Sequence, residues 1–418
     1  MKYMGSKRFM LSNGLGKLIN REIQKANRFV DPFSGSAAVV WHVAEKFHKP
    51  VLASDLQTYS AALARAVIGR SIVLDTNDLE NKWLAPGIQA FQKSKLYKEA
   101  YELQQRPGYQ IRKTVLASRV LCGSRKSVGP LWRAYGGHYF SPYQALAFDY
   151  LITTLPKEEP SRSVALASLI SAASKCAAAP GHTAQPFQPT KTAKKFIYAS
   201  WRIDPIQVTR LAMKGFAERH ANIQGEVRVA DAIDIVDEIR QGDLVLIDPP
   251  YSGVQYSRFY HVLETIARGK CGTVSGKGRY PSLSERPQSK YSNAGESLQE
   301  LKALMSKLAQ KRATVIFTFP KGQCSNGLSG DKIIAIVEEF FDIAPESRIH
   351  EHVVVGKFST LGGNNKTLLK NKETKKSRVV SQELILLLRP KQVLSGSKGG
   401  QKDNEKKDIP TSVSLLSV

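Results

Sequence analysis

Cysteine is scarce in this sequence, with four residues among 418. The four lie far apart, form no Cys-x-x-Cys pair and have no clustered histidines beside them. This spacing argues against a zinc site and against a disulfide framework, so we expect no bound metal and reduced, buried thiols. The cysteines are Cys122, Cys176, Cys271 and Cys324.

Long apolar runs are also missing. Residues 1–8 lack the apolar stretch of a signal peptide, and no later run approaches the length of a membrane span. We therefore expect a cytoplasmic protein that associates with the chromosome.

Acidic residues are few relative to basic ones, at 36 Asp and Glu against 61 Lys and Arg, which gives a formal net charge of +25 at pH 7. Residues 161–203 contain no Asp or Glu at all. A surplus of this size attracts polyanions, and nucleic acid is the usual one. The alternative is a generic basic surface kept for solubility, and charge alone does not separate the two.

Short apolar strands alternate with helical patterns in two segments, residues 1–75 and 223–390. This alternation is typical of a parallel sheet covered by helices. We predict that the two segments form one discontinuous α/β domain with a Rossmann-like sheet and a terminal antiparallel strand pair at 349–358 and 383–388. The other strands are expected at residues 27–30, 51–53, 227–229, 244–247 and 314–319, and the helices at 7–26, 36–47, 58–69, 258–268, 296–311 and 330–341.

The middle of the chain, residues 76–222, has a different composition. Residues 91–140 hold ten Lys or Arg against two acids, with aromatic residues between them. Basic groups beside aromatics suit phosphate contacts and base stacking, but for most of these aromatics we favour the alternative that they form the core of a helical insert. We predict an inserted, mostly helical DNA-binding domain at 76–222, a mobile loop at 270–294 and a disordered tail at 391–418.

Two features indicate a nucleotide-like ligand. Residues 31–37, Asp-Pro-Phe-Ser-Gly-Ser-Ala, follow the first strand as a small-residue turn that lets a ligand approach the backbone. About 20 residues later Asp55 closes the second strand, where a carboxylate is placed to accept hydrogen bonds from ribose hydroxyls. Each has a structural alternative, which is an ordinary strand-to-helix turn in the first case and a helix cap in the second.

The most specific feature is Asp248-Pro249-Pro250-Tyr251, which directly follows the apolar run 244–247. Such a run makes a buried strand, and a carboxylate at its end faces the crevice where open α/β sheets bind ligands. The Asp248 carboxylate and the Pro249 carbonyl are suited to bind the two protons of an aromatic amine and so to localise its lone pair. Tyr251 would stack on the base. The alternative is a capping Asp in a Pro-Pro loop.

Taken in order, these motifs resemble the Dam-like family of adenine-specific DNA methyltransferases. The family's opening motif is matched by residues 2–7, Lys-Tyr-Met-Gly-Ser-Lys, and its cofactor turn by residues 31–36, with Ala37 in place of the usual last glycine. The resemblance implies that a methyl group moves from S-adenosylmethionine to N6 of an adenine flipped out of duplex DNA. It assigns catalytic roles to Asp248, Pro249 and Tyr251. The cofactor-binding residues that it implies are Tyr3, Lys7, Phe33, Gly35, Asp55, Asp231 and Asp248.

The resemblance also implies that the insert recognises the target site. Within the insert, residues 180–187 form either a DNA-contacting loop or a turn packed on its own domain. The aromatics of residues 256–261 either line the target pocket or anchor a helix. A restriction endonuclease or a subunit of another defence system is a candidate protein partner. The residues predicted to contact DNA are Arg112, Lys113, Arg125, Lys126, Arg133, His182 and Gln185.

Two other functions fit part of the pattern. Amino-methyltransferases that act on cytosine N4 use a related Pro-Pro motif, more often with Ser or Asn in place of Asp248. A catalytically silent DNA-binding specificity subunit would keep the fold without needing the complete set of site residues, which are Tyr3, Lys7, Asp55, Asp231 and Asp248.

Overall fold

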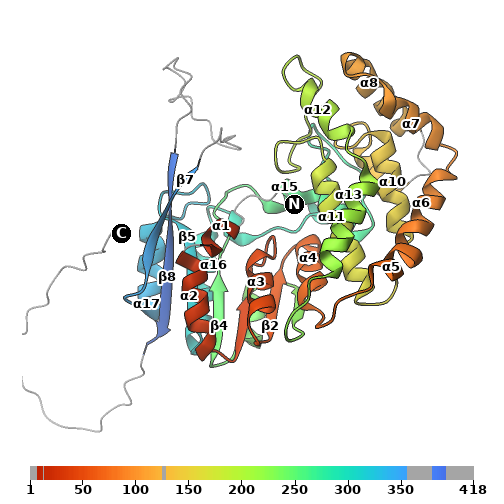
Figure 1. Ribbon diagram of the computed structural model, residues 1–418. Coiled ribbons are helices and arrows are strands. Elements are labelled where there is room, and N and C mark those ends of the chain that lie inside the picture. Colours follow the sequence, from red (N-terminus) through yellow and green to blue (C-terminus); the bar gives the residue numbers. More distant parts are fainter. Residues whose placement is uncertain (1–6, 13, 125–128, 355–378, 392–418) are drawn as a thin grey trace, which may run out of the picture.

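The computed structural model describes residues 7–12, 14–124, 129–354 and 379–391. It shows an α/β part beside a helical part, and the helices of the second part come mainly from the chain between the second and third strands (Figure 1).

One sheet runs through the α/β part. In the described residues it has eight strands in the order β3-β2-β1-β4-β5-β8-β6, with β7 also paired to β8. All pairs among the first five strands are parallel, whereas β8 runs antiparallel to its neighbours. The predicted Rossmann-like sheet with a terminal antiparallel pair is therefore confirmed. The strands are β1 (Arg28–Asp31), β2 (Val51–Asp55), β3 (Glu226–Val229), β4 (Asp243–Ile247), β5 (Thr314–Pro320), β6 (Phe341–Ile343), β7 (Arg348–Val354) and β8 (Val379–Pro390).

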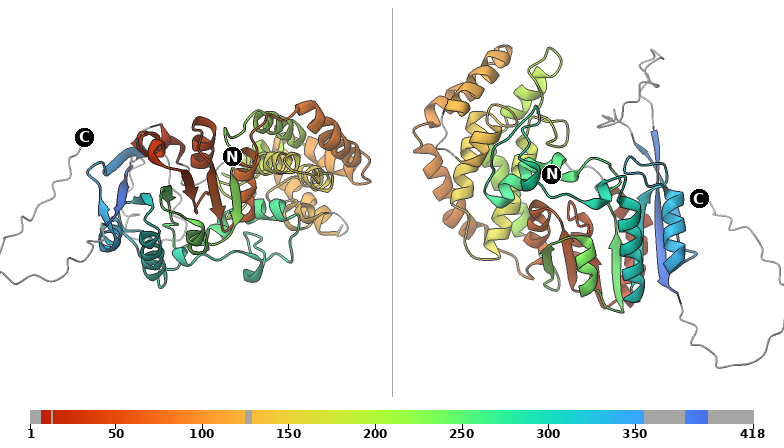
Figure 2. Two further views of the ribbon diagram at one scale, coloured as in Figure 1. Left: turned by 90° about the horizontal axis from the view of Figure 1, so that it is seen from below. Right: turned by 180° about the vertical axis from the view of Figure 1, so that it is seen from behind.

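Helices cover both faces of the sheet (Figure 2). Along β4, Leu244 and Leu246 belong to the core under α2, α3 and α4, whereas Val245 and Ile247 belong to the core under α16 and α17. A strand with apolar side chains on both faces must be covered on both, which is why this run lacks alternation. The helices here are α1 (Arg8–Leu11), α2 (Gly14–Glu22), α3 (Ala38–Lys46), α4 (Thr58–Ile68), α14 (Ala232–Ile235), α15 (Tyr256–Arg268), α16 (Ser297–Gln310) and α17 (Gly330–Phe340).

The helical part packs directly on the α/β part. Leu169 of α11 and Met213 of α13 are fully buried in the same apolar cluster as Leu63 of α4. The two parts thus share a core, and the domain boundaries expected at residues 75 and 222 stay predictions. The helices of this part are α5 (Thr76–Leu79), α6 (Ala85–Gln92), α7 (Tyr97–Gln105), α8 (Ile111–Ser124), α9 (Pro130–Tyr135), α10 (Pro142–Thr153), α11 (Ser161–Cys176), α12 (Lys194–Trp201) and α13 (Pro205–Ala217).

Several aromatic residues of the insert are core residues, as we favoured. Trp132, Tyr135 and Tyr139 are fully buried in the helical part. Tyr101 and Tyr109 are the exceptions, because 44% and 81% of their surface is exposed. Most of the aromatic side chains between the basic residues therefore stabilise the fold and are not free to stack on bases.

The strand and loop boundaries differ from the prediction at the C-terminal end. The strand β8 begins at Val379, four residues before the expected start, and β6 was not predicted. The strand β6 follows α17 without a turn and has only three residues, too few for a periodic pattern. Residues 355–358 of the expected terminal pair and residues 392–418 of the expected tail lie outside the described chain. Residues 270–294 contain short 3-10 turns, and their mobility stays a prediction.

The thiols only partly match expectation. All four cysteines are free, and Cys122 and Cys176 are buried, but Cys271 and Cys324 are half-buried. Among the described residues, no three His, Cys, Asp or Glu side chains group in a way that would hold a metal ion. The same part of the chain has no helix with the length and apolar character that a bilayer crossing requires.

A buried carboxylate joins α15 to the start of α4. Glu264 of α15 is 5% exposed and accepts the N–H of Thr58 at 3.2 Å and that of Tyr59 at 3.0 Å. The first amides of a helix have no partner within the helix, and the positive end of its dipole favours an anion. Glu264 therefore caps α4 from a neighbouring helix and fixes the loop between β2 and α4.

We expect Glu264→Ala to lower the free energy of unfolding by about 2–3 kcal/mol, because it leaves the first amides of α4 without an acceptor in a buried place. Urea denaturation followed by circular dichroism measures the change. Glu264→Gln keeps one acceptor oxygen and should lose about half as much. An alanine variant as stable as the wild type would contradict the capping role.

Candidate active site

A cleft opens at the carboxyl ends of the first four strands, with a volume of about 970 Å³ up to the open solvent. Among the described residues that line it, four acids face one lysine. The acids each lie at or just after the end of a different parallel strand, so the sheet itself gathers them at one edge, and the cleft suits a ligand with positive charge. They are Asp31 and Asp55, the last residues of β1 and β2, together with Asp231 shortly after β3 and Asp248 directly after β4.

The turn after β1 has an unusual backbone. Asp31 accepts the N–H of Phe33 at 3.0 Å, and Gly35 then takes a φ of +48°. Ala37, at the start of α3, has a φ of +60° and is fully buried. A left-handed conformation costs a residue with a Cβ roughly 1–2 kcal/mol. The alanine that replaces the family's usual glycine therefore fits by size, as expected, but strains the backbone.

Asp55 holds this turn against β2. Its Oδ2 accepts the N–H of Gly35 and its Oδ1 accepts the N–H of Gln57, both at 2.9 Å. Because α4 begins after Gln57 and is capped by Glu264, the alternative that Asp55 caps the helix is wrong. Burial raises the pKa of Asp55 to about 6, against the lowering effect of these two backbone bonds.

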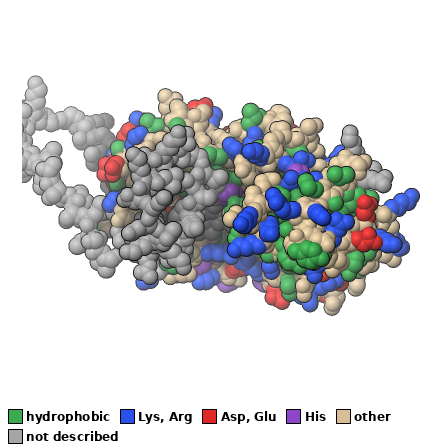
Figure 3. Space-filling model, turned by 90° about the horizontal axis from the view of Figure 1, so that it is seen from above, with side chains coloured by type: hydrophobic (Ala, Val, Ile, Leu, Met, Phe, Trp, Pro, Cys, Tyr) green, Lys and Arg blue, Asp and Glu red, His purple; other side chains and the backbone are tan. Residues whose placement is uncertain are grey.

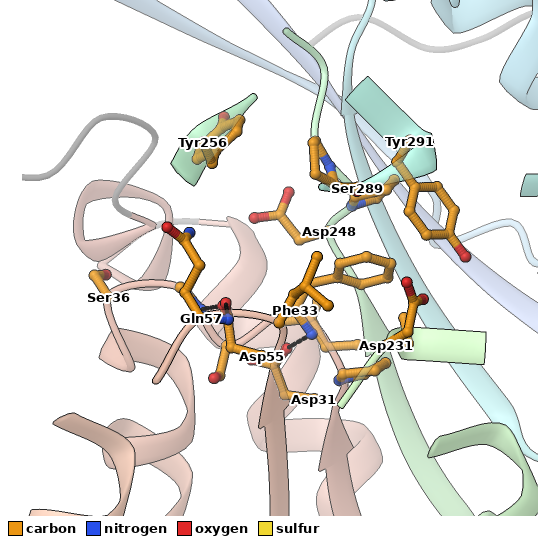
Figure 4. Close-up of a pocket in the computed structure, with 18 of the residues that line it drawn as sticks. Asp31, Phe33, Ser36, Asp55, Gln57, Asp231, Asp248, Tyr256, Ser289 and Tyr291 are labelled. Carbon is orange, nitrogen blue, oxygen red and sulfur yellow. Dashed lines mark hydrogen bonds between the residues drawn. The ribbon is translucent and has the colours of Figure 1, made fainter. Parts of the chain in front are cut away.

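A second group of residues lies at the opposite end of the cleft, where Figure 4 shows Asp231 and Tyr291 near Phe33. The rings of Phe33 and Tyr291 meet edge to face, with centroids 5.2 Å apart. Tyr291 is 1% exposed, and within the described chain its hydroxyl has no hydrogen-bond partner. A buried hydroxyl of this kind at a cleft is a group that a bound ligand would satisfy. Asp231 also caps α14, since it accepts the N–H of Ile233 at 3.3 Å.

The carboxylate of the Pro-Pro motif is held by a buried lysine. Lys7 Nζ lies 3.0 Å from Asp248 Oδ1 and 3.1 Å from Glu383 Oε2, and Thr318 donates to the same Asp248 oxygen at 2.9 Å. Burial opposes the charge on Lys7, but the two carboxylates outweigh it and raise the pKa of the lysine. Burial raises the pKa of Asp248, and Lys7 counteracts it. Both contacts use Oδ1 of Asp248.

Asp248 and the rings beside it face the same cleft. Pro249, Tyr251 and Tyr256 all line the cleft wall. Burial raises the pKa of Tyr251, against the effects of Lys7 and of a hydrogen bond with Tyr256. Of the aromatics in residues 256–261, Tyr256 lines the cleft, whereas Phe259 is buried and anchors α15. That Tyr256 contacts the target base stays a prediction.

Two side-chain amides fasten the loop of residues 249–255, which follows Asp248, to residues 287–292. Gln255 donates to the Ser289 carbonyl at 2.9 Å and accepts the Ser289 N–H at 2.7 Å. Asn326, which is fully buried, donates to the carbonyls of Pro250 at 2.9 Å and Tyr291 at 3.0 Å. The segment after α15 thus forms one wall of the cleft.

Most of the predicted DNA-contacting residues that are described lie on the surface, but His182 does not. It is 6% exposed, its Nδ1 accepts the N–H of Ala184, and its ring packs 5.3 Å from that of Phe259. A buried imidazole cannot reach a base, so the turn at 180–187 packs on its own protein at this position and the DNA contact predicted for His182 is wrong. Arg112, Lys113, Arg133 and Gln185 are exposed, whereas Arg125, Lys126 and Tyr3 lie outside the described residues.

Five residues of the site were not found from the sequence. They come from parts of the chain without a recognisable motif, and the fold alone brings them to the cleft. Only Tyr291 carried a signal in the sequence, since an aromatic residue in a polar Gly/Ser-rich stretch needs an apolar contact. The residues are Gln255, Tyr291, Thr318, Asn326 and Glu383.

A parallel sheet with acids at its carboxyl edge and a Pro-Pro turn after its central buried strand defines an α/β enzyme of the amino-methyltransferase class. The sequence model of the D12 class N6 adenine-specific DNA methyltransferase family matches residues 3–129 and 162–316, more than half of the chain. The protein belongs to this family, as the motifs indicated, and the family implies a methyl donor.

A curated relative agrees with the assignment over a short stretch. The chain is 43% identical over 75 residues to the protein named modification methylase LlaI of Lactococcus lactis subsp. lactis. The matched stretch covers 18% of this chain and 11% of that relative. Residues 317–391, which supply Thr318, Asn326 and Glu383, lie beyond the family match.

We expect Ala37→Gly to raise the free energy of unfolding by about 1 kcal/mol, because glycine adopts a φ of +60° without strain. Thermal and urea denaturation measure the gain. Ala44→Gly, in the right-handed backbone of the same helix, is the matched control and should lose about 1 kcal/mol or more. A loss of stability in Ala37→Gly would show that the alanine methyl contributes more than the strain costs.

The pKa of Asp55 predicts how cofactor binding depends on pH. A protonated carboxyl accepts hydroxyl hydrogen bonds poorly, so the carboxylate is the binding form. Since its pKa is about 6, affinity should be constant above about pH 7 and fall toward tenfold per unit well below pH 6. Calorimetric titration of S-adenosylmethionine between pH 5 and 8 tests this. Asp55→Asn should bind weakly at every pH, and a wild-type affinity that does not change over this range would contradict the role.

Proposed function

We propose that the protein transfers a methyl group from S-adenosylmethionine to the N6 amine of an adenine flipped out of duplex DNA. The observation that carries the proposal is the Asp248 carboxylate, which directly follows a fully buried strand, lines the cleft and is held through Oδ1 by Lys7 and Thr318. Membership of the family supports the acceptor, and the charge of the cleft supports the donor.

The residues of the cleft fit S-adenosylmethionine. Four acids and one lysine favour a molecule that carries a sulfonium and an ammonium group. Asp55 would accept the ribose hydroxyls, and Gly35 allows the backbone to approach the ligand closely. Phe33 and Tyr291 would border the adenine, with Asp231 as acceptor for its amine. When bound, the cofactor supplies a methyl group attached to a positively charged sulfur, and the sulfur keeps the electron pair of the broken bond.

The protein's own groups prepare the acceptor. The adenine amine is a weak nucleophile because its lone pair is delocalised into the ring. Asp248 Oδ2 and the Pro249 carbonyl would each accept one amine proton, which localises the lone pair on nitrogen and points it into the cleft. Burial raises the pKa of Asp248, so its carboxylate is also suited to take the proton that nitrogen releases. Tyr251 and Tyr256 would hold the base between aromatic faces.

Duplex DNA would lie across the helical part and the cleft. The net charge of +25 supports phosphate binding, and Arg112, Lys113, Arg133 and Gln185 remain exposed for it. A base inside a duplex cannot reach Asp248, so the proposal includes base flipping. A restriction endonuclease or another defence subunit remains a candidate partner.

The two rival functions lack support from the site. Cytosine N4 enzymes more often carry Ser or Asn at the position of Asp248, and the family match is to adenine-specific enzymes. A silent subunit would have no reason to keep an open cleft with Lys7, Asp55, Asp231 and Asp248 all directed to it.

We expect Asp248→Ala to lower the rate of methyl transfer by a factor on the order of 10³ or more, since it removes the acceptor that activates the amine. The variant should fold, because Lys7 keeps its pairing with Glu383. Transfer of a radiolabelled methyl group to DNA measures the rate, and a gel-shift titration should show DNA affinity within about threefold of the wild type.

Asp234→Ala is the control, because Asp234 is an exposed acid of α14 near the cleft. It should methylate DNA at the wild-type rate. Turnover by purified Asp248→Ala close to that of Asp234→Ala would refute the role of Asp248. A wild-type protein that does not bind S-adenosylmethionine would refute the enzyme function itself.

A further inference from the structure

Helix α8 presents an apolar stripe to solvent. Leu116 and Val120 lie one turn apart on its outer face and are 60% and 71% exposed, and Tyr109, just before the helix, is 81% exposed. Side chains of this kind are normally buried, and a group of them on one helix face marks an interaction surface.

The exposure of this stripe follows from how α8 is held. The inner face of the helix, with Ile111 and Val115, packs with Ile197 and Trp201 of α12 in a small buried cluster of its own. The inner face of α8 therefore supplies its buried apolar contacts, and Leu116 and Val120 on the outer face do not contribute to this core. They occupy the one-turn spacing that points side chains to the same side.

Charge on this surface identifies the kind of partner. Arg112 and Lys113 are exposed on α8 near the apolar stripe, and Lys195 is exposed on the neighbouring helix α12. The sequence has no Asp or Glu at 103–148 or at 160–203, and these two stretches contain the whole of both helices. Helices α8 and α12 thus carry apolar and basic side chains and no acid of their own, and the exposed acids Glu99 and Glu102 lie on α7, which packs beside α8. Two helices of this composition complement a polyanion with apolar edges.

The two helices lie on the side of the molecule toward which the parallel strands point, and both Figure 1 and the rear view in Figure 2 show this. The cleft opens at the carboxyl ends of the same strands. Seen from that side, Lys and Arg side chains stand among apolar ones over the helical part (Figure 3). A duplex that delivers a base to the cleft therefore meets α8 on the same side.

We propose that α8 enters the major groove beside the target adenine and that Leu116 and Val120 read thymine by contact with its C5 methyl group. The proposal rests on the proposed function, since it concerns how the same DNA is recognised. The major groove admits an α-helix, and the thymine methyl is the one apolar group on a base edge there. Arg112, Lys113 and Lys195 bind the flanking phosphates and fix the register.

Deoxyuridine provides the test, because it lacks only the methyl group of thymine. The recognised sequence is first mapped by sequencing modified adenines in a methylation-free host that expresses the full chain. Duplexes with each thymine near the target replaced in turn are then methylated by the purified protein. For the wild type, kcat/KM should fall about tenfold at one position or more. The Leu116→Ala/Val120→Ala variant should lose this sensitivity and accept thymine and uracil equally.

Leu211→Ala is the matched control, because Leu211 of α13 is a leucine with 59% exposure outside both acid-free stretches. It should keep the wild-type response to uracil. Surface substitutions of this kind change stability by less than about 0.5 kcal/mol, and unchanged melting temperatures confirm that all variants fold. Arg112→Ala/Lys113→Ala should weaken binding to all sequences alike and reduce the salt dependence by about two counterions.

The outcomes separate the two proposals. A wild-type protein that methylates no DNA contradicts the proposed function. A wild-type protein that methylates DNA but ignores every uracil, or a Leu116→Ala/Val120→Ala variant with wild-type sensitivity and affinity, overturns the role of α8. The latter result would assign the apolar stripe to a protein partner.

Discussion

The buried contact of Lys7 with Asp248 and Glu383 is the constraint on which the site depends. A carboxylate at the end of a fully buried strand is unfavourable unless a counter-charge accompanies it. Lys7 supplies this charge from the start of the chain, and Glu383 of β8 balances the lysine in turn. The arrangement joins three distant segments of the sequence and holds the Asp248 carboxylate in the wall of the cleft.

The segment after α15 relates the two parts of the molecule. At one end, Arg279 donates to the carbonyls of Arg133 and Ala134 and so caps α9 of the helical part. At the other end, Gln255 and Asn326 fasten Ser289 and Tyr291 to the loop of residues 249–255. The polar stretch at 270–294, which the sequence predicted to be a mobile loop, therefore connects the proposed DNA-binding helices to the cleft. Covalent and hydrogen bonds run without a break from α9 through this stretch to the loop of residues 249–255.

The elements that the sequence predicted are those defined by short-range patterns. The strand before Asp248 and the turn after it, and the acids at the ends of β1, β2 and β3, follow from apolar runs and from residues next to them. Glu383 and Thr318 were missed because their position depends on β8 inserting next to β5, a long-range pairing that periodicity does not contain. His182 was misplaced for a related reason, since its burial depends on Phe259, 77 residues away.

The charges of the molecule are separated between its surface and its cleft. The chain carries +25 overall, yet the described cleft lining holds four acids and one lysine. A phosphate backbone is attracted to the surface and repelled from the cleft, whereas an uncharged base can enter it. The same acids attract a cationic ligand through the low-dielectric interior, where their effect is stronger than in water. On the proposed function, this distribution of charge would admit a base and a positively charged donor to one place and keep the phosphates outside.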